Sequence, residues 1–369
     1  ILAITHIIFS SFINITMITL NKKYIKISIF IICLVLLFAF QKTNYLSVKS
    51  TVEIFLSSVL PSLFPFILFT NIITKSNIIN LITSIFKKFN NIMSVIIIGF
   101  LCGYPMGAKT TYEYYENNKI TKKQAYFLMS FANNCNPIFI LSTIGICVFN
   151  NLSIGIILCI SHYLSALLIG IIYFLHNNII HENVGKSNII NKNKGKILHK
   201  NVFEIVDESI KSTLIVLGNI FSFILIFNLL FSIIETILLK LNIQNSIIYT
   251  LSALFEVTNG CRLIYLNSGL LLNMIICITS FMLGFSGLSI IFQVFSCIYK
   301  ANIQLSHIVK YKLIQGILSF IITYFIVNIK NIPNKCTINL SNFSTTSYFI
   351  IIVSLLFIFV YSLKKVTQK

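Results

Sequence analysis

Long apolar runs, separated by short polar connections, make up most of the chain. The runs lie near residues 25–40, 53–74, 92–108, 125–149, 151–175, 212–239, 246–266, 269–298, 313–329 and 347–363. A helix needs about 20 apolar residues to cross the hydrocarbon core of a bilayer, and several of these runs reach that length. The pattern predicts an all-α polytopic membrane protein.

Two of the runs differ from ordinary crossing segments. The runs at 92–108 and 246–266 are each interrupted by glycine, with polar residues close behind. Irregular backbone at membrane depth persists only where protein or a water-filled cavity satisfies its polar groups. We therefore interpret both runs as re-entrant helical hairpins. A plain crossing is the alternative for the first run, and the lysines on both sides of it disfavour that alternative.

The two halves of the chain resemble each other in sequence. One set of segments is 65–69, 103–109 and 130–137, and the other is 222–227, 256–262 and 280–287. Matching segments are about 150 residues apart. Apolar stretches also resemble each other by composition alone, but here order and spacing agree as well. The pattern favours two inverted repeats, an arrangement typical of transporters whose site lies between the halves.

These observations divide the chain into five parts. They are an N-terminal segment 1–24, a first membrane repeat 25–176, a linker 177–211, a second membrane repeat 212–330, and a C-terminal membrane helix with a basic tail at 331–369. The chain begins with Ile, and Met17 is a candidate initiator. The lysine-rich linker is expected in the cytoplasm by the positive-inside rule.

Charge and composition narrow the function classes. Only 10% of the residues are charged, against about 25% in globular domains, so the expected partner is the lipid bilayer. The net charge is +19, but no soluble basic module with aromatic stacking residues accompanies it, and nucleic-acid binding is not expected. No metal-ligand spacing, cofactor motif or catalytic motif is present, so we predict no metal, no cofactor and no enzymatic activity.

The first interrupted run carries candidate substrate-binding residues. Gly99, Gly103 and Gly107 would form one smooth stripe on a helix, which simple helix packing also explains. A proline after Tyr104 breaks such a helix and frees polar backbone groups. Lys109 then suits a substrate carboxylate, although a lysine at the membrane interface is an equal interpretation.

A second candidate cluster lies in the following apolar run. Asn133, Asn134 and Asn136 place three amides beside a proline. Each amide offers two donors and one acceptor, enough to bind a polar ring or a carboxylate. Hydrogen bonding between helices is the alternative interpretation of this cluster.

The second interrupted run carries Glu256 and Arg262, with Thr258, Asn259 and Gly260 between them. Ionisable residues in an apolar segment are costly unless they are buried, paired or functional. Six positions apart, the two charges do not pair on a straight helix. We expect a break at Asn259–Gly260 that brings them together or directs both toward a ligand.

At these motifs the chain resembles the sporulation integral membrane protein YlbJ family, within the group that carries the nucleoside-recognition (Gate) domain. The resemblance rests on 60–66, 103–109, 133–137 and 256–261, and it spans most of the chain from about residue 25. It implies a fold like that of concentrative nucleoside transporters.

The resemblance also implies a function in endospore-forming bacteria. It implies a protein in the mother-cell-derived membrane around the forespore that moves dipicolinic acid, a small aromatic dianion, out of the mother-cell cytoplasm. A nucleoside or ion permease and a non-transporting sporulation scaffold are the alternatives. The sequence leaves the oligomeric state open, a homo-oligomer included.

Overall fold

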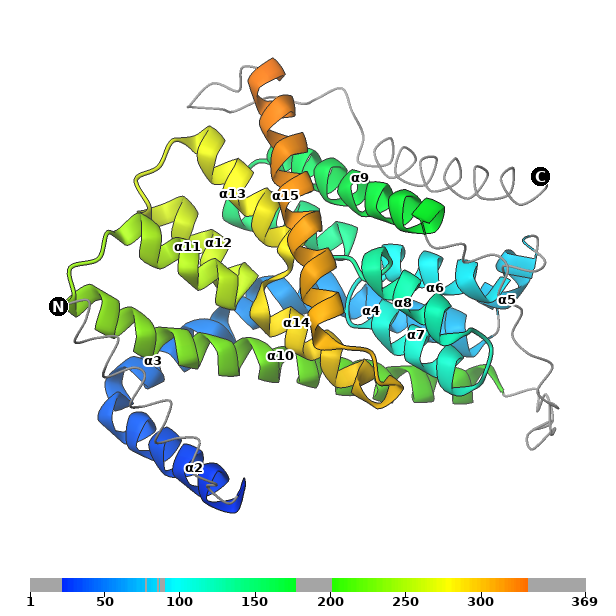
Figure 1. The fold of residues 1–369 in the computed structure, drawn as a ribbon, viewed down its shortest axis with the longest axis horizontal. Helices are drawn as coiled ribbons and strands as arrows, with labels where there is room; N and C mark the ends of the chain where they lie inside the picture. The colour runs from blue at the N-terminus through cyan, green and yellow to red at the C-terminus, as the bar shows by residue number, and fades with distance from the viewer. Residues whose placement is uncertain (1–21, 77, 85, 87–89, 177–200, 331–369) are drawn as a thin grey trace.

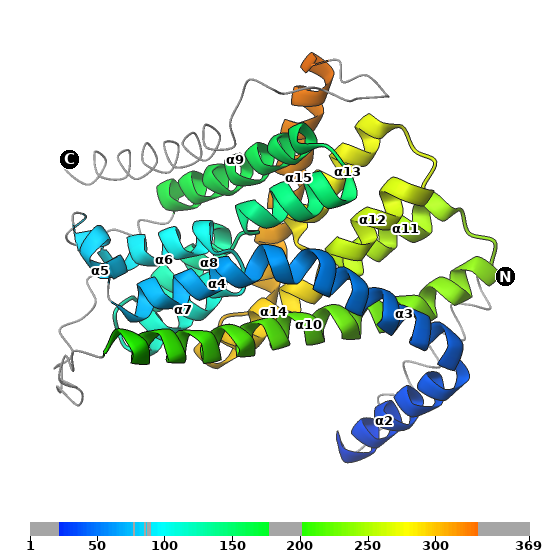
Figure 2. The same cartoon turned by 180° about the vertical axis from the view of Figure 1, so that it is seen from behind.

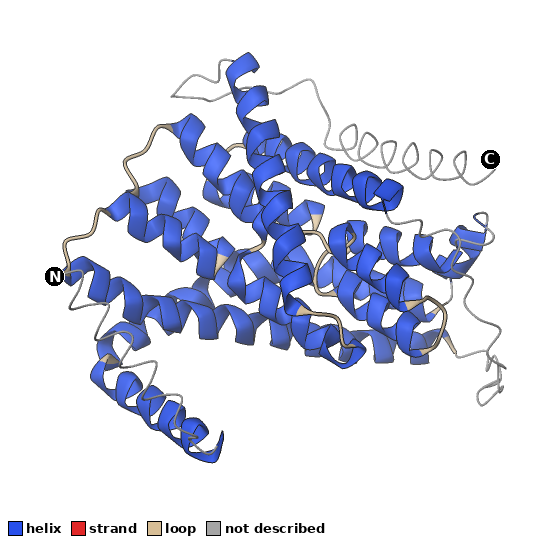
Figure 3. Cartoon of the chain, in the orientation of Figure 1, coloured by secondary structure: helices blue, strands red, loops and turns tan. Residues whose placement is uncertain are grey.

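The computed structural model describes residues 22–76, 78–84, 86, 90–176 and 201–330. Within these ranges the chain forms helices and loops and no strand (Figure 3). The predicted start segment up to residue 21, the linker up to residue 200 and the C-terminal helix near 347–363 lie outside the described residues. The all-α prediction is therefore confirmed for the part that is described.

The first half begins with an exposed helix and continues through a series of shorter and longer helical elements. They are α2 (Lys22–Ala39), α3 (Gln41–Ile54), η1 (Phe55–Val59), α4 (Leu60–Lys75), α5 (Ile78–Thr83), α6 (Asn90–Leu101), α7 (Met106–Glu116), α8 (Lys122–Phe131), η3 (Phe139–Val148) and α9 (Leu152–His176). The segments η1 and η3 are π-helical, and α3, η1 and α4 form one continuous helix.

From α3 onward, and with α5 left aside, the second half has elements in a similar order. It contains α10 (Val202–Lys240), α11 (Asn245–Phe255), α12 (Val257–Asn267), α13 (Leu272–Phe285), α14 (Gly287–Ile298), η5 (Tyr299–Ala301) and α15 (Leu305–Lys330). Each half thus has a long helix, a helix pair, a broken helix and a further long helix. Five helical stretches in the described chain are long and apolar enough to cross a membrane.

The continuous helix formed by α3, η1 and α4 lies beside α10, and the two run in opposite directions (Figures 1 and 2). Near one end, the Asn71 amide donates to the Thr213 hydroxyl over 3.0 Å. Near the other end, the Asn228 amide donates to the Thr51 hydroxyl over 3.0 Å. Lipid tails are as apolar as leucine, so such polar contacts and close packing hold membrane helices together.

The interrupted run 92–108 belongs to a hairpin of α6 and α7. The chain turns at Gly103, whose φ of +76° favours glycine, and Pro105 directly precedes α7. At the open end, the Asn91 side chain donates to the Lys119 carbonyl over 2.9 Å. The start of α6 and the end of α7 therefore meet, as a hairpin requires.

The second interrupted run forms a hairpin of α11 and α12, and its turn differs from the prediction. The break expected at Asn259–Gly260 is wrong, because the backbone turns at Glu256, and α12 is continuous from Val257 to Asn267. Gly260 instead permits close packing of the two arms. A Cβ atom added there would lie 2.1 Å from the Cα atom of Ala253.

The remaining apolar stretches include two helices that are broken near their middles. Residues between Phe131 and Phe139 separate α8 from η3, and Ser286, at a φ of +76°, separates α13 from α14. The two hairpins lie at opposite ends of the molecule, with α14 between them (Figures 1 and 2). The fold therefore directs both hairpin turns and both helix breaks toward its centre.

Candidate functional site

A small cavity of about 30 Å³ lies between the two halves. The same three kinds of element line it from each half. The long helices contribute Val59, Leu63, Ile220 and Ile224; the hairpins contribute Tyr104, Glu256 and Thr258; and the broken helices contribute Cys135, Asn136, Phe139, Ile290 and Gln293. Two of these residues, Val59 and Phe139, belong to π-helical segments, which occur often at functional sites.

Asn136 joins the first hairpin to the first broken helix. Its side-chain oxygen accepts a hydrogen bond from the Ile138 amide over 2.8 Å at the start of the second half-helix. Its amide nitrogen donates to the carbonyls of Leu101 and Cys102 over 3.3 and 3.4 Å, where α6 ends. One buried side chain thus satisfies two helix ends, which would otherwise carry unpaired polar groups.

The neighbouring asparagines have different surroundings. The Asn134 side chain donates to the Phe131 carbonyl over 2.7 Å, and its backbone carbonyl accepts from the Tyr104 amide over 2.7 Å. The side chain of Asn133 is 1% exposed and has no hydrogen-bond partner among the described residues. Two of the three amides in the cluster therefore hold the helix break in place, and the third is unused.

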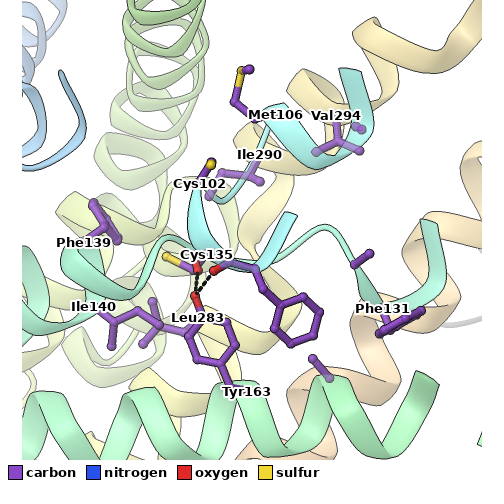
Figure 4. Close-up of a cluster of buried hydrophobic side chains, with 14 of the residues drawn as sticks. Cys102, Met106, Phe131, Cys135, Phe139, Ile140, Tyr163, Leu283, Ile290 and Val294 are labelled. Atoms are coloured by element: carbon purple, nitrogen blue, oxygen red, sulfur yellow. Dashed lines mark hydrogen bonds between the residues drawn. The ribbon is translucent and has the colours of Figure 1, made fainter. Parts of the chain in front are cut away.

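Two residues of α9 bind the backbone of the break, and one of them, Tyr163, points toward Cys135 in Figure 4. The Tyr163 hydroxyl lies 2.6 Å from the carbonyl of Cys135 and 2.9 Å from that of Phe100. The Cys135 amide donates to the imidazole of His162 over 3.1 Å. His162 is thus a packed helix residue that also binds the backbone of the break.

The glycines of the first hairpin do not form one helical stripe, which corrects the sequence interpretation. The break places Gly99 and Gly107 on opposite arms, and both face the carbonyl of Ala132. Gly103, at the turn, packs on the backbone of Asn136. Small residues at these positions let the hairpin lie directly on the broken helix.

Glu256 caps the helix that follows it. One carboxylate oxygen accepts from the Thr258 amide over 2.9 Å, and the other accepts from the Asn259 amide over 2.7 Å. The side chain is almost fully buried and lines the central cavity. A carboxylate is favourable at this position because the first amides of a helix are unpaired and carry partial positive charge.

Two polar groups that line the cavity are poorly satisfied. The side-chain nitrogen of Gln293 is buried and has no hydrogen-bond partner in the described part of the chain, and the buried hydroxyl of Tyr104 has only the Cys135 thiol, a weak acceptor, beside it. Buried polar groups in proteins are nearly always bonded. Both groups can donate, so the cavity suits a ligand that carries hydrogen-bond acceptors.

Arg262 lies outside the central cavity, at two wider ones. The first of these has a volume of about 300 Å³ and shares Thr258 with the central cavity. The second has a volume of about 640 Å³, and Asn259 contributes to its lining. Arg262 and Glu53 line both of the wider cavities. Residues of α12 therefore line the central cavity and both wider cavities.

The structure separates the predicted site residues into groups. Tyr104, Asn136, Glu256 and Thr258 meet at the central cavity, whereas Asn259 and Arg262 line the wider cavities. The predicted cation Lys109 lines none of these three cavities. It lies on α7, where its charge acts on Glu113 and Cys297.

The sequence interpretation missed three buried polar residues near the centre. They are Gln293 on α14 and Lys312 and Gln315 on α15. The apolar run near 313–329 begins just after Lys312, whereas the helix begins at Leu305. A longer predicted helix would have included Lys312 and so revealed a lysine inside a membrane segment.

Comparison with known proteins finds a relative among sporulation membrane proteins. Neither a protein-family model nor a solved structure matches the chain. The chain is 26% identical over 302 residues to the sporulation integral membrane protein YlbJ of Bacillus subtilis (strain 168), which covers 73% of this chain and 74% of that protein. Together with the five apolar helices, this similarity supports the assignment of the chain to the YlbJ family of sporulation integral membrane proteins.

Proposed function

We propose that this protein is a secondary transporter that binds a small anionic solute between its two halves. The central cavity carries the proposal, because a long helix, a hairpin turn and a broken helix of each half line it. Sites of this kind, built from discontinuous helices at a repeat interface, are typical of secondary transporters. In this proposal, α6–α7 and α11–α12 are re-entrant hairpins of two inverted repeats.

The proposed orientation follows from the lysines. The ammonium group of Lys75, at the end of α4, lies 2.8 Å from the Ser212 hydroxyl and 3.8 Å from the Glu208 carboxylate, near the start of α10. This end of the bundle adjoins the lysine-rich linker, which the positive-inside rule places in the cytoplasm. The 640 Å³ cavity lies at the other end, beside Thr43 and Glu235, and so faces away from the cytoplasm.

The proposed solute is a small aromatic dicarboxylate, with dipicolinic acid as the first candidate. Arg262 supplies a cation beside the wider cavities, and Gln293 supplies an unused donor at the centre. The central cavity of about 30 Å³ has room for only about one or two water molecules, so in this proposal it widens when the solute enters between the apolar side chains of both long helices. The similarity to a sporulation membrane protein favours a solute of spore formation and a location in the membrane around the forespore.

Arg262→Ala tests an anion route past this residue. We measure dipicolinate flux in proteoliposomes, with and without a proton gradient. Charge-assisted hydrogen bonds contribute about 1.5–3 kcal/mol, so we expect the variant to need roughly ten- to a hundredfold more dipicolinate for half-maximal flux. The control Lys240→Ala removes an exposed cation at the end of α10 that lines none of the three cavities, and its flux should equal that of the wild type.

Two results would contradict parts of the proposal. Equal half-saturation in the Arg262 and Lys240 variants would exclude the anion route past Arg262. Absence of dipicolinate flux from folded wild-type protein would exclude this solute, and nucleosides would be tested next in the same vesicles. Absence of flux for every solute would favour a non-transporting membrane protein.

A further inference from the structure

A fully buried lysine contacts the break in the first broken helix. Lys312, on α15, is 2% exposed. Its ammonium group donates to the backbone carbonyl of Asn133 and, over 2.9 Å, to the side-chain oxygen of Gln315. The Gln315 amide in turn donates to the Asn134 side chain over 3.0 Å. Lys312 thus reaches from the second half of the chain to the break in the first.

No carboxylate among the described residues pairs with Lys312. A buried charge is costly, and ionisable residues inside membranes normally pair or serve a function. A neutral donor of similar length, such as glutamine, would satisfy the Asn133 carbonyl at lower cost. Hydrogen bonding alone therefore does not account for a lysine at this position.

The position of the ammonium group, at the end of the half-helix α8, gives a reason for the lysine. The half-helix α8 ends at Phe131, and its C-terminal end carries partial negative charge from carbonyls without helical partners. Within this end, the Phe131 carbonyl accepts from Asn134, the Asn134 carbonyl from the Tyr104 amide, and the Cys135 carbonyl from Tyr163. The carbonyl of Asn133 accepts from Lys312.

In transporters with broken helices, the backbone carbonyls at the C-terminal ends of half-helices coordinate alkali cations. Here the side-chain oxygen of Gln315 joins the carbonyl of Asn133, and the buried amide of Asn133 lies in the same segment without a partner among the described residues. We propose that Lys312 is a tethered monovalent cation. Its ammonium group occupies a cation position at the end of α8, and removal of the side chain leaves a site for a free monovalent cation.

The experiment measures the unfolding temperature of purified Lys312→Ala in sodium chloride, ethylammonium chloride and choline chloride series of equal ionic strength. A ligand that binds only the folded state raises stability with its concentration. In choline chloride, we expect Lys312→Ala to unfold at a lower temperature than the wild type. Its unfolding temperature should then rise as the concentration of sodium or ethylammonium increases. Wild-type protein should respond equally to all three salts. The readout needs no transport, so it is independent of the proposed function.

The control is Lys310→Ala, which removes an exposed lysine from the same helix and should show no sodium-specific rise. If Lys312→Ala yields no folded protein in any salt, Lys312→Ser decides by the same comparison, because its short side chain leaves the ammonium position empty. A rise specific to sodium or ethylammonium supports the tethered cation. Equal responses to all three salts overturn it, and they assign Lys312 to packing and hydrogen bonding alone.

Discussion

Replacing Gly99 with alanine is expected to destabilise the protein by at least about 3 kcal/mol, the upper end of the usual cost of overpacking a core. An added Cβ atom would lie 1.8 Å from the backbone oxygen of Ala132. That oxygen cannot move alone, because Asn134 and Asn136 fix the same segment through hydrogen bonds. The hairpin would have to separate from the broken helix. Unfolding of the purified variant in detergent measures the effect.

Gly218→Ala is the matched control for this prediction. Gly218 lies on the exposed side of α10, and a methyl group added there would have no atom within 4 Å. Alanine is the better helix former, so this variant should gain about 0.5–1 kcal/mol. The same methyl group thus has opposite effects at the two sites. Similar stability of the two variants would show that the hairpin does not pack on the break as described.

The sequence predicted the type of each element better than its boundaries. Apolar run length identified membrane helices, because the bilayer sets a minimum length whatever the tertiary contacts. Glycine and proline marked the first hairpin turn, since both residues act on the local backbone. The second turn was misplaced because Asn259–Gly260 resembles a turn, whereas Gly260 is needed for helix packing against Ala253.

The candidate site was predictable only in part. Tyr104, Asn136, Glu256 and Thr258 line the central cavity, and each stood out as a polar residue near a helix break. The partners of a polar residue depend on contacts far along the chain, which a local pattern does not contain. Lys312 illustrates this limit, because 179 residues separate it from the carbonyl that it binds.

The structure also shows why one residue can serve both fold and function. Glu256 holds the turn of the second hairpin and lines the cavity at the same time. Hairpin turns at membrane depth need internal partners for their amides, because no lipid group supplies them. A cap built from a carboxylate meets that need and also places an ionisable group next to the proposed solute path. A change at Glu256 should therefore alter stability and transport together.

Glu256→Ala is expected to cost about 2–4 kcal/mol, since it removes a helix cap and leaves two buried amides unpaired. Glu256→Gln should fall between alanine and the wild type, because its side chain offers one acceptor in place of two. When flux is compared at equal amounts of folded protein, both variants should still transport less than the wild type. Unfolding in detergent and proteoliposome flux provide the two measurements.

The matched control is Glu204→Ala, which removes an exposed carboxylate from the first turn of α10. An exposed charge near a helix start contributes at most about 1 kcal/mol, so this variant should unfold close to the wild type and transport normally. If Glu256→Ala unfolds like Glu204→Ala, the cap does not stabilise the hairpin. If it is destabilised but transports normally per folded molecule, Glu256 serves the fold alone, and the solute path must avoid the turn of α11–α12.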